Sequence, residues 1–269
     1  MIIDFHTHVF PEKIAKKTVE VLAEKSNNPP HSDGTVSGLI SALGEAGADV
    51  AINLPVITKA EQFESVLQFA SALNARKYEG ERIISFAGIH PDIDDPFEKL
   101  SEVKRCGILG IKIHPDYQNT YIDDDRYVRI FEAAKRLGLI VVTHSGLDGA
   151  YVGQPIKCTP RRVLNLLDKI GGYEKLVLAH IGANEMFDEV YSELCGLDVY
   201  FDTAYSLHGI SEDLFKKILE KHGDGKILFA TDSPWQSIKS EADIIKGFKL
   251  GGDTERKIFS ENALKILGI

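Results

Sequence analysis

The first ten residues, MIIDFHTHVF, combine apolar side chains with one carboxylate and two imidazoles. Side chains alternate along a strand, so we expect Asp4, His6 and His8 on one face and Ile3 and Phe5 on the other. Two histidines at this spacing hold their rings about one pleat apart, so that one ion can contact both. The D-x-H-x-H pattern therefore predicts a metal-binding strand, in which Asp4 orients an imidazole rather than touching the ion. The alternative for Asp4 is a buried carboxylate bonded to backbone amides.

Further polar side chains end other apolar runs of the sequence. They are Lys112 and His114 in IKIH, His144 in VVTH, His180 in LAH and Asp232 in FATD. Several imidazoles and a carboxylate buried at equivalent strand ends would lack partners unless a cation organises them. Nitrogen and carboxylate ligands suit Zn²⁺ and similar divalent ions, and a catalytic site keeps one position open for water. The sequence thus predicts a divalent metal centre.

The elements that must position these residues are short β-rich runs, each followed by a segment of helical periodicity. Eight such strands are predicted, over residues 2–9, 49–56, 82–90, 107–114, 139–144, 175–182, 198–205 and 226–232. Amphipathic helices are predicted over 59–78, 125–138 and 161–172, and a closing helix over 255–269. Eight strand–helix units in 269 residues indicate an α/β fold, a (β/α)₈ TIM barrel. A doubly wound sheet is disfavoured because no glycine-rich phosphate turn follows the first strand.

The whole chain, residues 1–269, is predicted to be one domain, since no linker or low-complexity tract divides it. The longest irregular stretches cover residues 26–38, 115–127 and 145–162, after the first, fourth and fifth strands. In a barrel these loops lie over the carboxyl ends of the strands, where substrates bind.

The net charge of −9 offers no basic surface for nucleic acid or for an anionic membrane, so neither is expected as a partner. Three separated cysteines without a C-x-x-C pair are typical of a reducing compartment. The amino terminus shows neither a basic n-region nor a long apolar h-region, and no run of about 18 apolar residues occurs, so we expect neither a signal peptide nor a membrane span. We therefore expect a cytoplasmic protein that acts on a small molecule.

The motifs DFHTH, VVTHS, LAHIG and FATDSPW resemble those of the amidohydrolase superfamily of metal-dependent barrels. GIKIHP and TDSPW resemble the amidohydrolase-related branch that contains aminocarboxymuconate-semialdehyde decarboxylase. The resemblance implies metal ligation by His6, His8, His144 and Asp232, with His180 near the metal water and counted as a fifth candidate ligand. It also implies zinc, with manganese, iron or nickel as alternatives, and a homodimer.

Lys112 has three roles open to it. A carboxylated lysine at this point of the chain bridges two metals in binuclear members of the superfamily, whereas the decarboxylase branch is usually mononuclear and lacks it. Lys112 could also hold a substrate carboxylate, or form a structural ion pair, because a lysine inside a barrel is costly unless it is paired or converted. We favour one metal, with Lys112, His114 and Trp235 facing the substrate.

The leading functional prediction is a metal-dependent hydrolase that directs metal-activated water at a small amide, ester or lactone. Asp232 would accept the proton of the water, and His180 would polarise the carbonyl oxygen. The alternative is a non-oxidative decarboxylase of a small unsaturated or aromatic carboxylic acid. A metal nuclease fits less well, because no glutamate stands in GILGIKIHP. A non-catalytic binding barrel is a further alternative, since fold alone does not imply activity.

Overall fold

The computed structural model describes residues 1–75 and 82–269 of the chain. Its short strands are β1 (Ile3–Thr7), β2 (Val50–Asn53), β3 (Arg82–Ser85), β4 (Ala87–Gly88), β5 (Gly110–Ile113), β6 (Ile140–Thr143), β7 (Leu176–Leu178), β8 (Tyr200–Asp202) and β9 (Ile227–Leu228). Each strand lies within one of the eight predicted ranges, and the third range contains both β3 and β4, separated by Phe86. Strand β3 pairs with β2 and strand β4 with β5, so the two together form one barrel position.

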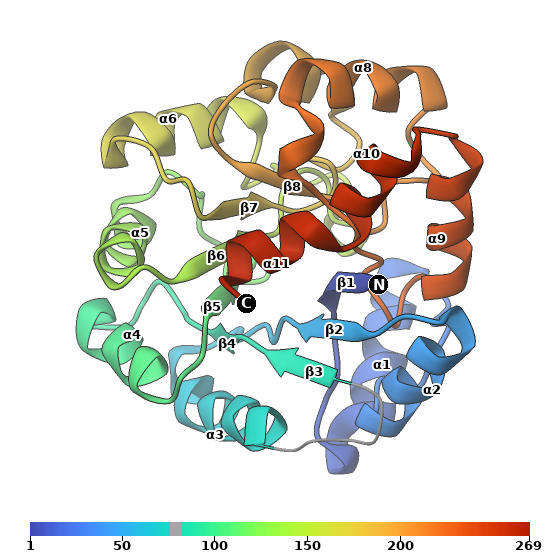
Figure 1. Cartoon of the computed structure of the whole chain (residues 1–269). Coiled ribbons are helices and arrows are strands. Elements are labelled where there is room, and N and C mark those ends of the chain that lie inside the picture. Colours follow the sequence, from blue (N-terminus) through green and yellow to red (C-terminus); the bar gives the residue numbers. More distant parts are fainter. Residues whose placement is uncertain (76–81) are drawn as a thin grey trace.

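All strand pairs are parallel, and the first and last strands meet. The Phe5 amide donates to the Phe229 carbonyl over 2.9 Å, and Thr7 bridges to Ser233. Between β2 and β4 the Phe86 amide donates to the Asn53 carbonyl over 2.9 Å. These bonds close the sheet, so the predicted (β/α)₈ barrel is confirmed (Figure 1).

Helices surround the barrel, and most of them follow a strand (Figure 1). They are α1 (Glu12–Ser26), α2 (Val36–Ala46), α3 (Phe63–Ala75), α4 (Pro96–Arg105), α5 (Asp125–Leu137), α6 (Pro160–Ile170), α7 (Phe187–Glu189), α8 (Glu212–His222), α9 (Ile238–Gly247), α10 (Gly252–Arg256) and α11 (Asn262–Leu267). Of the helix predicted over 59–78, residues 76–78 lie outside the described residues. A helical turn over Ala60–Gln62 and helix α3 account for most of the rest.

The ends of helix α6 show why the local sequence specifies this element. The Thr159 side chain accepts a hydrogen bond from the Arg162 amide, and Pro160 occupies the first turn, where its missing N–H costs nothing. Gly171 ends the helix with a left-handed φ of 65°, which glycine adopts without steric cost. The prediction for 161–172 is therefore confirmed to within two residues at each end.

The prediction that Asp4 shares a face with His6 and His8 is wrong. The pairing register of β1 against β2 shifts between Asp4 and Thr7, as at a β-bulge, and such an extra residue redirects the side chains that follow it. Asp4 accepts hydrogen bonds from the Thr231 hydroxyl at 2.5 Å and from the amides of Thr231 and His6 at 3.1 and 3.2 Å. Asp4 is thus a buried structural carboxylate that ties β1 to the segment after β9, and it contacts no imidazole.

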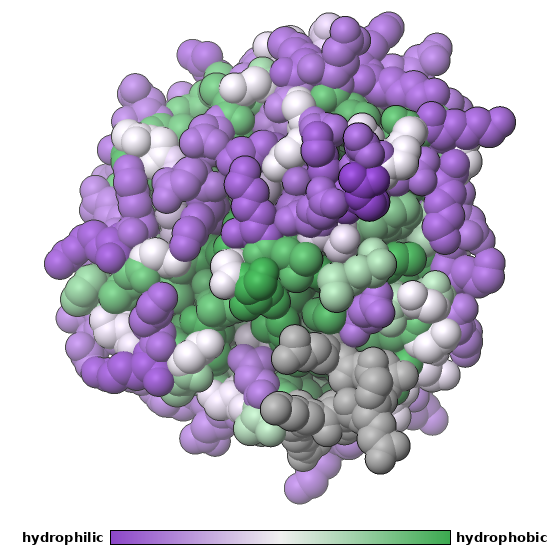
Figure 2. All heavy atoms as spheres, viewed as in Figure 1, coloured by the Kyte–Doolittle hydropathy of each residue, from purple (hydrophilic) through white to green (hydrophobic). Residues whose placement is uncertain are grey.

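The interior of the barrel is apolar up to the level of the polar side chains. Ile3 and Phe5 belong to a buried cluster that draws residues from β1, β2, β6, β7, β8 and β9. Ala263, Ile266 and Leu267 of α11 join this cluster. Helix α11 crosses the end of the barrel that faces the viewer in Figure 1, and Figure 2 shows an apolar region over it. The carboxyl-terminal helix therefore closes the bottom of the barrel, opposite the carboxyl ends of the strands.

Within the described part of the chain, no helix combines the length and the apolar content that crossing a bilayer requires.

Truncation of a side chain in this interior should cost much of the stability of the protein. Phe5 has no exposed surface and packs edge-on against Phe86 at a centroid distance of 6.1 Å. We expect Phe5→Ala to lower the free energy of unfolding by about 3–5 kcal/mol, through lost burial and the cavity left behind. Urea denaturation measures this loss, and Ile14→Ala on the exposed side of α1 serves as the control. A loss below about 1 kcal/mol would contradict the packing described here.

Helix α9 buries a carboxylate that lies outside the predicted metal centre. Burial, with a smaller effect from the charge of Asp4, raises the pKa of Glu241 from 4.5 to about 8. The folded chain therefore binds this proton more tightly than the unfolded chain, and the free energy of unfolding should fall as pH rises from about 5 to about 8. Glu241→Gln should flatten this dependence, which urea denaturation across the same pH range measures. An unchanged slope in the variant would refute the assignment to Glu241.

Candidate metal centre

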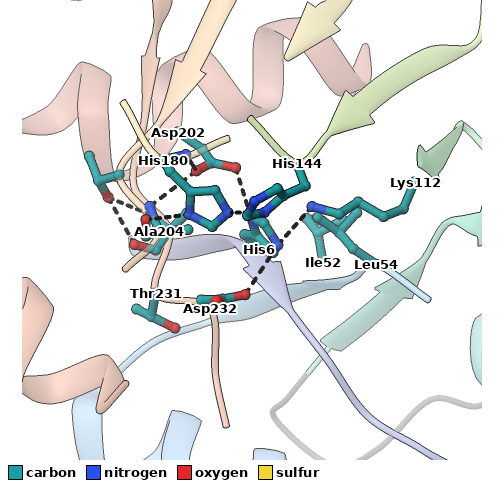
Figure 3. Close-up of polar contacts among 12 residues, drawn as sticks. His6, Ile52, Leu54, Lys112, His144, His180, Asp202, Ala204, Thr231 and Asp232 are labelled. Carbon is teal, nitrogen blue, oxygen red and sulfur yellow. Dashed lines mark hydrogen bonds and ion pairs between the residues drawn. The ribbon is translucent and has the colours of Figure 1, made fainter. Parts of the chain in front are cut away.

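The chemistry-bearing residues lie at or just beyond the carboxyl ends of the strands. His6 is within β1, while His8 and His144 directly follow the ends of β1 and β6. His180 and Asp232 come after β7 and β9 and adopt left-handed backbone angles, with φ of 64° and 66°. Such angles are costly for residues other than glycine and are concentrated at functional sites, where the surrounding structure imposes them. Figure 3 shows His180, His144, His6 and Asp232 directed toward a common centre.

His6, His8 and Asp232 form a group whose ligand atoms all lie within 4.8 Å of one another. Nε2 of His8 is 3.0 Å from Oδ1 of Asp232, and Nε2 of His6 is 3.3 Å from the same oxygen. Burial alone would raise the pKa of Asp232, but His6 and His8 outweigh it, so the pKa is lowered and the carboxylate is ionised at neutral pH. Three of the five predicted ligands are therefore in place around one point.

The other ring nitrogen of each histidine is occupied by an acceptor. Nδ1 of His6 lies 2.9 Å from Oδ2 of the buried Asp202, and Nδ1 of His8 lies 2.8 Å from the carbonyl oxygen of Leu54. A carboxylate and a carbonyl only accept hydrogen bonds, so each Nδ1 donates its proton, and Nε2 is the ring nitrogen that faces the centre. Burial, together with the charge of Lys112, lowers the pKa of His6 well below its usual range, which keeps that ring neutral.

The chemistry of these side chains tests whether a cation fits. Nε2 of His6 and Nε2 of His8 both face Oδ1 of Asp232, at 3.3 and 3.0 Å. Imidazole nitrogen and carboxylate oxygen are the ligand atoms that Zn²⁺ and similar divalent ions take. Asp202 and Leu54 hold the two imidazoles in an orientation that presents Nε2 to such an ion. The donor set therefore fits a metal ion.

His144 and His180 form an adjoining pair rather than part of the three-ligand group. Nδ1 of His180 lies 2.8 Å from the Ala204 carbonyl oxygen, and its Nε2 lies 2.9 Å from Nδ1 of His144. Nε2 of His144 is buried and has no hydrogen-bond partner among the described residues. The His180 and His6 rings are 5.4 Å apart between centroids, so the pair borders the first group. Metal ligation by His144 and His180 stays a prediction.

Lys112 enters the centre from β5, as the inward orientation in IKIH predicts. Its Nζ lies 3.0 Å from Nε2 of His6, and its side chain is buried (Figure 3). Burial lowers the pKa of Lys112 to about 8, while the charges of Asp202 and Asp232 oppose this shift. The amine thus stands beside the atoms that a metal or a substrate would contact. Among the described residues, no carboxylate lies within ion-pair distance of Nζ, so the alternative of a direct structural ion pair is not realised.

His114 and Trp235, the other predicted substrate residues, differ in position. The ring of His114 stacks on His144 with centroids 4.1 Å apart, and its Nε2 lies 3.2 Å from Oδ2 of Asp148. His114, His144 and Asp148 make a second group with ligand atoms within 4.8 Å of one another. Trp235 is half-buried, and its amide donates to the Asp232 carbonyl, which fixes the turn after Asp232.

The sequence left two roles open for Asp202, support of the metal ligands or a bond to the neighbouring strand, and it gave no indication of Asp148. Asp202 also accepts from the amides of His180 and Ala204 at 2.9 and 3.1 Å, so one carboxylate orients His6 and anchors the His180 turn. The position of Asp202 at the end of the predicted strand DVYFD was the sequence feature that pointed to the site. Asp148 lies in a loop, where no periodicity indicates which way a side chain points.

With the geometry established, comparison with known proteins identifies the family. The sequence matches the family model described as Amidohydrolase over residues 3–269. The chain belongs to the amidohydrolase family. The match extends over almost the whole chain, as the motifs predicted. No curated protein matches the sequence.

Solved structures share the fold of this amidohydrolase at low identity. A 5-carboxyvanillate decarboxylase from Sphingomonas paucimobilis is 18% identical, with 100% of this chain and 99% of that chain covered and a TM-score of 0.69. A dihydroxybenzoic acid decarboxylase from a Polaromonas species, with bound manganese, is 16% identical, with 99% and 96% covered and a TM-score of 0.72. A probable 2-pyrone-4,6-dicarboxylic acid hydrolase from Acinetobacter baumannii is 18% identical, with 100% and 99% covered and a TM-score of 0.66.

Proposed function

We propose that this amidohydrolase is a divalent-metal-dependent, non-oxidative decarboxylase of a small unsaturated or aromatic carboxylic acid. The observation that carries the proposal is the buried amine of Lys112, 3.0 Å from a ring nitrogen of the three-ligand group. A cation at that position suits a substrate carboxylate held beside the metal. The names of several structural matches, decarboxylases of hydroxylated benzoic acids, also support this choice over the hydrolase that we favoured from the sequence.

His6, His8 and Asp232 would hold the ion, and when bound it supplies positive charge that orients the acid and stabilises developing negative charge. Lys112 would bind the carboxylate that leaves. The bond between the ring carbon and the carboxylate carbon then breaks, and CO₂ departs while its bonding electrons stay on the ring carbon. That carbon takes up a proton. We assign this delivery to Nε2 of His180, because the Ala204 carbonyl occupies Nδ1, and a proton from solvent water then replaces the one delivered.

Hydrolysis is the second candidate, and one observation favours it. Asp232 has a lowered pKa and stands between two metal-binding imidazoles, where it can accept a proton from water. The match to a protein named as a probable 2-pyrone-4,6-dicarboxylic acid hydrolase agrees with this role. The two reactions use the same residues but different leaving groups, so product analysis separates them.

Purified protein stripped of metal and reloaded with Mn²⁺ or Zn²⁺ tests the proposal. It is offered 2,6-dihydroxybenzoate and 5-carboxyvanillate, with release of CO₂ as the readout, and separately 2-pyrone-4,6-dicarboxylate, with ring opening as the readout. We expect CO₂ release that requires the ion and no ring opening. Ring opening without CO₂ release would support the hydrolase instead, and inactivity in both assays would favour a binding barrel.

A further inference from the structure

A polar contact outside the metal centre joins helix α9 to the loop that follows β8. Nε2 of His208, in this loop, lies 2.8 Å from Oε1 of Glu241 in α9. The Glu241 side chain is fully buried, whereas that of His208 is 52% exposed. Among residues 1–75 and 82–269, no other polar group bonds either carboxyl oxygen of Glu241. A buried carboxyl group without partners is costly, so within this part of the chain the contact with His208 is what offsets that cost.

The loop that carries His208 folds into a compact turn around Ser206. The Ser206 carbonyl accepts hydrogen bonds from the amides of Gly209 and Ile210, each over 3.0 Å. The Ser206 amide donates in turn to the Thr203 carbonyl over 3.3 Å. These bonds connect His208 to the preceding residues of the loop, so a displacement of His208 displaces those residues as well.

The same turn fixes the ring of His180. The Ala204 carbonyl accepts a hydrogen bond from Nδ1 of His180 over 2.8 Å (Figure 3). It also accepts one from the Ser206 hydroxyl over 3.0 Å. Tyr205, between these two residues, has a left-handed φ of 56°, which is costly outside glycine and persists only where surrounding contacts impose it. The direction of the Ala204 carbonyl therefore depends on the conformation of the whole turn.

The two ends of the turn are held in different ways. At its start, the Thr203 hydroxyl donates to the Ala230 carbonyl and accepts from the Ala230 amide, both over 2.9 Å, so Thr203 moves with the barrel. At its far end, the contact between His208 and Glu241 ties the turn to α9. Leu207 is buried, so we expect loss of this contact to loosen the turn without unfolding the protein.

We propose that the pair formed by Glu241 and His208 positions His180. The pair holds the turn after β8 in the conformation in which the Ala204 carbonyl binds Nδ1 of His180, and it thereby sets the orientation of the imidazole. The inference rests on the proposed function for what His180 does in the reaction, which is to deliver a proton. Glu241 and His208 act through Ala204 and take no part in bond breaking, so both are positioning residues.

The Nδ1 proton of His180 reports directly on this arrangement. Its exchange with solvent is measured by nuclear magnetic resonance on Zn²⁺-loaded protein labelled with ¹⁵N-histidine, and its signal is identified by its absence from His180→Asn. We expect His208→Ala to accelerate the exchange at least about tenfold, because the turn then opens more often. In His208→Gln the exchange should stay slow, since the Gln amide can donate to Oε1 of Glu241 as Nε2 of His208 does.

Lys239→Ala is the matched control, because it breaks an exposed ion pair of α9, between Lys239 and Asp243 at 2.7 Å, without touching the turn. Unchanged exchange in His208→Ala would overturn the inference, whatever the effect of that substitution on the rate of turnover. A purely structural role of His208 would lower the melting temperature of His208→Ala and leave the exchange unchanged, which also overturns it.

Turnover supplies the second readout. We expect His208→Ala to lower kcat by about 10- to 100-fold and to change KM by less than about twofold, because the proton donor is displaced while Lys112 and the ion still receive the substrate. His208→Gln should restore kcat to within about threefold of the wild-type value. Faster exchange with unchanged kcat would support the positioning of His180 but refute its assignment as proton donor. Absent CO₂ release in the wild-type protein would refute the proposed function, and the exchange measurement would still decide this inference.

Discussion

The His8→Ala protein is expected to bind no divalent ion at the barrel mouth and to lose activity by a factor on the order of 10³ or more. His8 supplies one of three ligand atoms that lie within 4.8 Å of one another, and two protein ligands hold a divalent ion poorly. His6→Ala should behave in the same way. Metal content after dialysis and the rate of CO₂ release measure the two effects.

Thermal stability gives a second readout that does not depend on the substrate. An ion that binds only the folded state raises the melting temperature of the wild-type protein as its concentration increases, and this shift should vanish in His8→Ala. His31→Ala is the matched control, because His31 is exposed and the backbone, not the side chain, makes its bond to Pro234. Full metal content in His8→Ala would remove His8 from the ligand set.

The His180→Asn protein is expected to keep its metal and to lose turnover by about 10²- to 10⁴-fold, the usual contribution of a positioned acid or base. His180 lies outside the three-ligand group, with its Nε2 directed at His144 and its Nδ1 fixed by Ala204. The asparagine side chain is polar, but it cannot transfer a proton near neutral pH. Parallel measurement of metal content, kcat and KM distinguishes this role from ligation.

A substitution of His144, the partner of His180, tests the assignment of the proton donor further. His144→Asn removes the partner of His180 without removing the proton donor, so we expect a smaller loss of kcat than in His180→Asn. An unchanged rate in His180→Asn would show that the proton comes from another group. Loss of the ion from His180→Asn would instead make His180 a ligand, as the ligand set expected from the sequence also allows.

Much of the barrel could be predicted from the sequence because its signals are local. Apolar runs of four or more residues mark buried parallel strands, and caps such as Thr159 and Gly171 mark the ends of helices through contacts within a few residues. The predicted positions of the strand ends also placed His6, Lys112 and Asp232 together at the mouth of the barrel. The reason is that the carboxyl ends of parallel strands share one edge. The third strand position is divided at Phe86, which the continuous run RIISFAGIH does not indicate.

The sequence left two roles open for Asp4, because the choice depends on a single extra residue in the pairing of β1 with β2. The alternation of side chains along a strand predicted that the Asp4 carboxylate lies beside the histidines. The register shift instead turns this carboxylate toward Thr231. The residue that does orient His6 is Asp202, 196 positions away along the chain. No periodicity carries information about a hydrogen bond between segments so far apart.

The sequence alone therefore determined the kinds of ligand atoms, the strands that carry them and the common edge at which they meet, since these follow from local patterns and from the geometry of parallel strands. Only the tertiary structure decided which nitrogen of each histidine faces the centre, that Lys112 reaches His6, and that His208 reaches Glu241. These arrangements depend on loop conformations and on contacts between distant segments.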